Sequence, residues 1–71
     1  MQGLSVQIVS VKDRDGLVAE IWHENEMVAE INVEAGKTQI EIYRPRETAH
    51  WSFDLKEFED CLQQAKQRLL K

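Results

Sequence analysis

Three glutamates, Glu20, Glu30 and Glu41, stand between apolar residues in stretches that alternate apolar and polar side chains. Glu20 and Glu30 belong to a Val-Ala-Glu-Ile tetrapeptide that occurs twice. Carboxylates gathered on one surface can exchange protons, bind a hard cation or dock on a basic partner. Proton exchange needs a pocket that shifts a pKa or excludes water, and a flat sheet face lacks one. The glutamates therefore favour docking, and we expect no catalytic, metal or cofactor site.

The other reactive side chains are few and far apart in the chain. His23 and His50 have no second histidine or cysteine at zinc-ligand spacing. Cys61 is the single cysteine, which excludes a disulfide within the chain, and no base is placed to activate it. We expect Cys61 to be a small buried side chain and the protein not to be an enzyme.

Alternation and turn residues predict four strands, over residues 5–11, 17–23, 27–33 and 38–44. The segment DRDG suits a type I turn closed by a left-handed glycine, ENE a three-residue loop, and EAGK a hairpin with Ala-Gly at its tip. Pro45 ends the last strand. The short turns predict an antiparallel meander in the order 1-2-3-4.

After the strands, the apolar spacing changes from two to about three and a half residues, which predicts a helix over 54–70. Asp54 can cap it with Glu57 as capping-box partner, and Phe53 and Phe58 are spaced for a hydrophobic staple. Because an isolated helix or hairpin of this length is marginal, the helix must cover the sheet. The expected fold is α+β, a single domain over residues 1–71 with one C-terminal helix packed on one face of the sheet. Its apolar stripe consists of Leu55, Phe58, Leu62, Ala65 and Leu69.

The strand register decides which side chains the helix covers. A three-residue ENE loop pairs His23 with Met27, and the Ala-Gly turn places Ile31 opposite Ile40. A slip by one residue would leave glutamate charges unpaired in the core. The face toward the helix is then expected to hold Val9, Val11, Leu17, Ala19, Ile21, His23, Met27, Ala29, Ile31, Val33, Ile40 and Ile42.

The opposite face carries the predicted partner-binding surface, made of two rows. The aromatic row is Trp22, Val28 and Tyr43, extended by Ile8, and the acidic row is Glu20, Glu30 and Glu41 beside Ser10. Like charges on neighbouring strands cost on the order of 0.2–1 kcal/mol, so three in line indicate a use. An apolar patch rimmed by charge is typical of interaction surfaces, although the glutamates could equally serve only solubility.

A formal net charge of −4 favours a protein partner with a basic surface and opposes binding to a phosphate backbone. One alternative is a homodimer that uses the aromatic row. Another is a nucleic-acid binder that uses Trp22, Tyr43 and the basic loop of Arg44 and Arg46. The chain shows no targeting segment and no run of about 18 apolar residues, so we expect a cytoplasmic protein without a membrane partner.

The stretches GLVAEIWHENEMVAEINVE (16–34) and WSFDLKEFEDCLQQAKQRL (51–69) resemble small acidic bacterial proteins with four strands and one helix. Toxin-immunity proteins and phage anti-CRISPR inhibitors are among them. The resemblance implies a bacterial or phage protein that binds and blocks another protein. It rests on pattern and assigns no functional residue.

Overall fold

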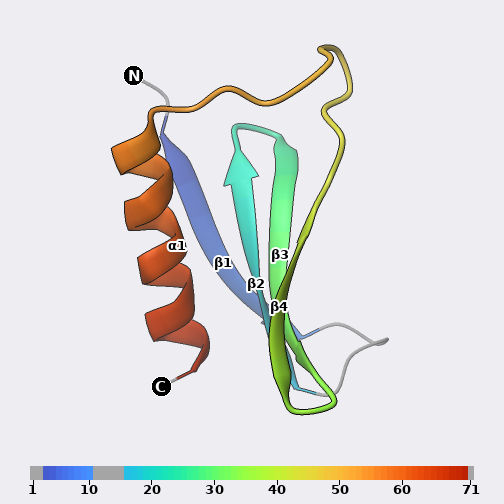
Figure 1. Ribbon diagram of the computed structural model, residues 1–71, viewed down its shortest axis with the longest axis vertical. Coiled ribbons are helices and arrows are strands. Elements are labelled where there is room, and N and C mark those ends of the chain that lie inside the picture. Colours follow the sequence, from blue (N-terminus) through green and yellow to red (C-terminus); the bar gives the residue numbers. More distant parts are fainter. Residues whose placement is uncertain (1–2, 11–15, 71) are drawn as a thin grey trace.

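A four-stranded antiparallel sheet carries one helix in the computed structural model, which describes residues 3–10 and 16–70 (Figure 1). The strands pair in the order β1-β2-β3-β4, and the helix contacts β1 and β2, so the predicted architecture is confirmed. The bounds are Leu4–Ser10 for β1, Leu17–His23 for β2, Glu26–Glu34 for β3, Lys37–Ile42 for β4 and Leu55–Leu69 for α1. The turn expected around Asp13 lies outside the described residues.

The β3–β4 hairpin forms as the sequence predicts. Ala35 and Gly36 both have positive φ, 55° and 75°, as a two-residue type I′ turn requires. This turn sets the register, and Ile31 lies opposite Ile40. Glu30 of β3 and Glu41 of β4 therefore point away from the face that carries α1.

The β2–β3 hairpin differs from the expected one. Its turn is formed by Glu24 and Asn25 alone, with Glu24 at a φ of 57°, and His23 pairs with Glu26 instead of Met27. A β-bulge between Ile21 and Trp22 then restores the expected pairing of the rest of the hairpin. The turn is one residue shorter than expected and the bulge adds one residue to β3, so the two changes cancel in the register.

The bulge also explains why Val28 does not lie on the exposed face where the sequence placed it. Trp22 pairs with Met27 and Ile21 pairs with Ala29, so Val28 is the extra residue of β3. A bulge re-aims the side chains around it, and Val28 lies in the hydrophobic core with 1% of its surface exposed. Its placement in an exposed aromatic row is wrong.

Strand β1 is shifted by one residue from the predicted phase. Val6 pairs with Ile21 and Ile8 pairs with Ala19, so the even-numbered residues of β1 share the helix side of the sheet. The predicted placement of Val9 toward the helix, and of Ile8 and Ser10 away from it, is therefore wrong. Val11 lies outside the described residues. The observed phase brings Leu4, Val6 and Ile8 to the core.

Small side chains let α1 lie close to the sheet. Ala65 is fully buried and Cys61 is 6% exposed, and both belong to one core cluster with Ala19 and Ala29 of the sheet. Arg68 Nη1 donates to the backbone oxygen of Val6, which fixes one side of α1 against β1.

The start of α1 confirms Asp54 as the predicted N-cap. Asp54 Oδ2 accepts from the backbone N–H of Glu57 at 3.0 Å, and the rings of Phe53 and Phe58 stack 5.7 Å apart. No helix in the described part of the chain is long and apolar enough to cross a membrane.

Candidate functional site

The acidic row forms as predicted, because Glu20 pairs with Glu30 and Glu30 pairs with Glu41 across adjacent strands. The carboxylates of Glu20 and Glu30 are nevertheless engaged within the protein. Trp22 Nε1 donates to Glu20 Oε1 at 3.0 Å, and Glu30 is only 8% exposed. The row is therefore not a freely exposed acidic surface.

Glu30 lies at the centre of a hydrogen-bond network on this face. Its two carboxylate oxygens accept from Asn32 Nδ2 at 3.0 Å and from the Tyr43 hydroxyl at 3.2 Å. Asn32 is fully buried and accepts from Gln39 Nε2, which also donates to Glu34. These neutral donors offset the repulsion between the carboxylates. The sequence prediction did not single out Asn32 or Gln39, although alternation places both in line with the glutamates.

The two remaining members of the aromatic row border a shallow hollow of about 340 Å³. Trp22 is half-buried and Tyr43 is 37% exposed. Arg44 and Arg46 also line the hollow, together with Asn25, Glu26 and Met27. Arg46 is held by Glu26, whose Oε2 lies 3.5 Å from its Nε and accepts from its backbone N–H. The residues proposed for nucleic-acid binding therefore come together, but one of the two cations is already paired.

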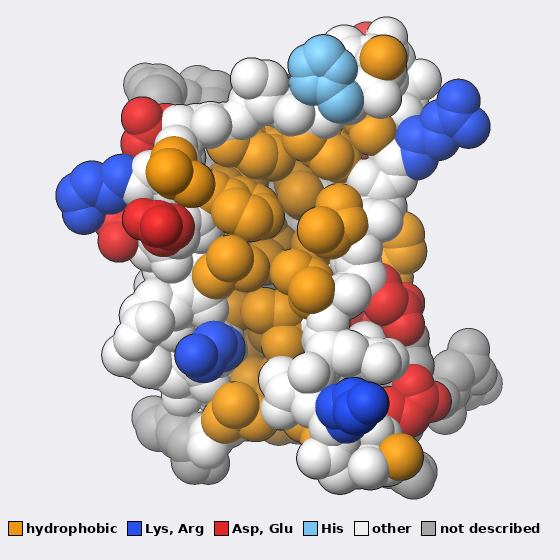
Figure 2. Space-filling model, in the orientation of Figure 1, with side chains coloured by type: hydrophobic (Ala, Val, Ile, Leu, Met, Phe, Trp, Pro, Cys, Tyr) orange, Lys and Arg blue, Asp and Glu red, His pale blue; other side chains and the backbone are white. Residues whose placement is uncertain are grey.

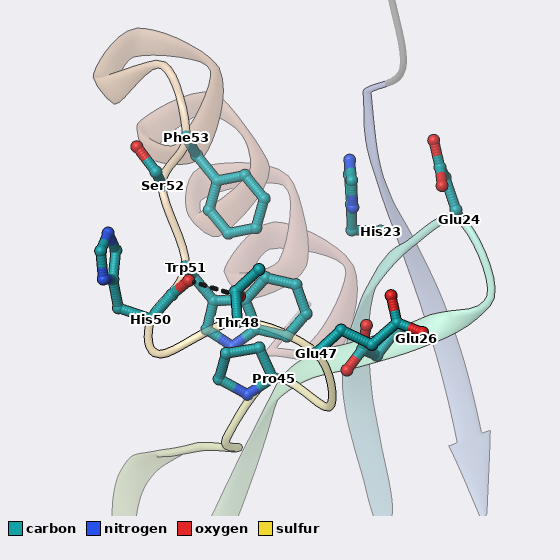
Figure 3. Close-up of a pocket in the computed structure, with 10 residues that line it drawn as sticks. All are labelled: His23, Glu24, Glu26, Pro45, Glu47, Thr48, His50, Trp51, Ser52 and Phe53. Carbon is teal, nitrogen blue, oxygen red and sulfur yellow. Dashed lines mark hydrogen bonds between the residues drawn. The ribbon is translucent and has the colours of Figure 1, made fainter.

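A second cavity, of about 350 Å³, lies under the loop between β4 and α1 (Figure 3). The His23 ring packs edge-on against Trp51 and Phe53, and Trp51 Nε1 donates to the backbone oxygen of Tyr43 at 2.7 Å. Figure 3 shows His50 on the other side of Trp51 from His23, so the two imidazoles do not converge. The cavity is thus built around packed aromatic rings. It is lined by His23, Glu24, Glu26, Pro45, Glu47, Thr48, His50, Trp51, Ser52 and Phe53.

The described residues assemble no group of three histidine, cysteine or acidic side chains that could hold a metal ion. Cys61 is buried, as predicted, and the pKa of its thiol is raised by that burial and, secondarily, by the charge of Glu57. A buried, protonated thiol is a poor nucleophile.

A long apolar surface lies on the face that carries α1, beside the helix (Figure 2). α1 lies over β1 and β2, and the same face stays open over β4 and over the end of β3 at Val33, whereas Ala29 and Ile31 of β3 are buried. Ile42 is 63% exposed, Ile40 41% and Val33 38%. The sequence prediction that the helix would cover these residues is wrong, because a helix about 10 Å wide spans only about two strands at a spacing of about 4.8 Å.

One flank of α1 forms the wall of this surface. Arg68 reaches β1, and Cys61 and Ala65 face the sheet, so helical spacing turns the rest of the apolar stripe toward β3 and β4. Figure 2 shows hydrophobic side chains filling the hollow between the helix and the last strand. We call this surface the apolar groove. Its floor is the exposed Val33, Ile40 and Ile42, next to the buried Ile31, and its wall is the half-buried Phe58, Leu62 and Leu69.

The described part of the chain thus presents the apolar groove on the face that carries α1 and the hollow beside Trp22. Comparisons with protein-family models, with characterised proteins and with solved structures found no match for this chain.

Proposed function

We propose that this protein is a noncatalytic binding module that holds an amphipathic helix of a partner protein in the apolar groove. The observation that carries the proposal is the exposure of Ile40 and Ile42 beside the apolar flank of α1. Contiguous apolar surface of this kind on a small protein is characteristic of an interaction site.

The dimensions of the groove favour a helix as its occupant. Four strands span about 19 Å, and one helix with its side chains is about 10 Å wide. The part of the sheet beside α1 is therefore about as wide as one more helix, and its exposed residues are those of β4 together with Val33 of β3. A helix lying there beside α1 would bury an apolar stripe against both the floor and the wall, as in other helix-in-groove complexes.

The charge of the chain favours a partner helix with lysine and arginine on its polar side. A net charge of −4 attracts such a helix and raises the rate of association. This keeps the basic partner surface expected from the sequence but moves its contact from the acidic row to the groove. The most concrete version remains an immunity-type or anti-defence inhibitor that blocks a basic surface of its target.

A helical peptide of about the length of α1, with leucine on one face and lysine on the other, tests this proposal. Added to isotope-labelled protein, it should shift the NMR signals of Ile40, Ile42 and Leu62 and leave those of Trp22 unchanged. A peptide of the same composition in scrambled order controls for charge alone. Ile42→Asp should abolish the shifts, whereas Glu41→Gln on the opposite face should preserve them.

If neither peptide moves the groove signals of the folded protein, the proposal fails. The hollow that brings Trp22 and Tyr43 beside Arg44 makes single-stranded nucleic acid the second candidate. An oligothymidylate titration in the same experiment distinguishes it, because the Trp22 indole signal would then move instead of the isoleucine signals.

A further inference from the structure

We propose that two copies of the chain pair through the outer edge of β4, antiparallel, about a twofold axis at Gln39. Within the described residues β4 pairs on one side only, with β3. An edge strand presents unpaired N–H and C=O groups to which another strand can bind. The segment Lys37–Ile42 holds regular register with β3, without a proline or a bulge, so its edge is straight enough to pair.

The hydrogen-bond alternation identifies the groups that point outward. The backbone N–H of Tyr43 donates to Val28 O at 2.8 Å, toward β3. Since the backbone groups of an antiparallel strand alternate in direction, those of Thr38, Ile40 and Ile42 point away from β3. These three residues can form ladder bonds with a second β4.

The charges of β4 select the register of the pair. Lys37 and Glu41 stand at equal distances on either side of Gln39. Antiparallel pairing about Gln39 sets Lys37 opposite Glu41 of the second copy, and it does so twice because the interface is twofold. An axis at Glu41 would oppose two glutamates, and an axis at Ile40 would form no ion pair. The strand is therefore self-complementary in one register.

This pairing keeps each side of the sheet continuous between the copies. Thr38 lies opposite Ile40 of the second copy on the side that carries α1, so the two apolar grooves become neighbours on one surface. The inference goes beyond the proposed function and does not depend on it, because the edge of β4 and the floor of the groove are different surfaces.

Charge exchange between two variants tests the register. Lys37→Glu places glutamates opposite each other, and Glu41→Lys places lysines opposite each other, so each variant should dimerise about tenfold more weakly than the parent. When the two variants are mixed, every facing pair is again of opposite charge, and a heterodimer should form with roughly parental affinity. Sedimentation velocity on the separate and mixed proteins measures both effects.

Lys56→Glu and Glu59→Lys make the same charge changes on the exposed side of α1 and should leave dimerisation unchanged. NMR spectra of each variant confirm that it is folded. A parent protein that stays monomeric up to about millimolar concentration would overturn the proposal. Equal dimerisation affinity of the parent and both β4 variants would also overturn it. So would a mixture of the two variants that forms no heterodimer.

Discussion

The role of a side chain in this protein depends on its neighbours across the strands more than on its own type. Alternation alone predicted that Glu20, Glu30 and Glu41 share one face, and the register confirms it. The burial of Glu30 could not be predicted, because it depends on hydrogen-bond donors from other positions, chiefly Asn32. A row that looked like a charged docking surface is in part an internal polar layer.

Asn32→Asp tests this polar layer. The substitution replaces a donor 3.0 Å from Glu30 with a second carboxylate in a fully buried position. Two facing carboxylates repel when both are ionised, so the folded variant binds a proton more readily than its unfolded chain does. The free energy of unfolding should therefore fall as pH rises, with a loss of about 1–3 kcal/mol near pH 7.5 that shrinks toward pH 4.5.

Denaturant unfolding at the two pH values measures the effect. Asn25→Asp makes the same chemical change in the exposed β2–β3 turn and should show little of this pH dependence. An Asn32→Asp protein as stable as the parent at neutral pH would show that the network around Glu30 contributes nothing.

Elements with strong local signals were predicted accurately, and those without them were not. The cap at Asp54 and the Ala-Gly turn each determine their own geometry, so α1 and the β3–β4 hairpin match the structure. Strand β1 offers apolar residues in both phases, Val6 and Ile8 or Val9 and Val11, so alternation did not distinguish between them. A one-residue bulge such as the one in β3 leaves no mark in the composition.

The close contact of α1 with the sheet predicts that Ala65 tolerates no larger side chain. Ala65 is fully buried and belongs to the same core cluster as Ala19 and Ala29. Ala65→Leu would force α1 outward and should lower the free energy of unfolding by about 1–3 kcal/mol. Gln64→Leu adds the same side chain at the exposed neighbouring position and should change stability little. Equal stability of the two variants in thermal unfolding would contradict the described helix position.

The β3–β4 turn contains a correctable strain. Ala35 adopts a φ of 55°, which is unfavourable for alanine but well tolerated by asparagine. Ala35→Asn creates the Asn-Gly pair that a type I′ turn prefers and should stabilise the protein by on the order of 0.5–1 kcal/mol. Ala49→Asn, in the exposed β4–α1 loop, is the matched control with no expected gain. An unchanged melting temperature for Ala35→Asn would argue against a left-handed residue at this turn.

One helix is too narrow to cover a four-stranded sheet. The radius of gyration is 12.2 Å, somewhat above the roughly 11 Å expected for a chain of this length. The sequence predicted the helix and part of the sheet face that it covers, but the lateral position of the helix follows from the packing of Ala65 and Cys61 against β1 and β2. The apolar groove is the consequence of that position.

The open groove predicts that the native protein binds hydrophobic probes without being unfolded. The fluorescent dye ANS should bind the parent at neutral pH, because Ile40 and Ile42 are 41% and 63% exposed. The double substitution Ile40→Thr and Ile42→Thr keeps β-branched side chains, so the free energy of unfolding should change by less than about 1 kcal/mol while dye binding falls sharply. Ile21→Thr is the opposite control, since Ile21 is fully buried and a hydroxyl there should cost about 2–4 kcal/mol. If the double variant instead unfolds as readily as Ile21→Thr, then Ile40 and Ile42 are core residues and α1 must cover more of the sheet than β1 and β2. If it stays folded and binds the dye as well as the parent does, the exposed apolar surface of the native protein lies outside the groove.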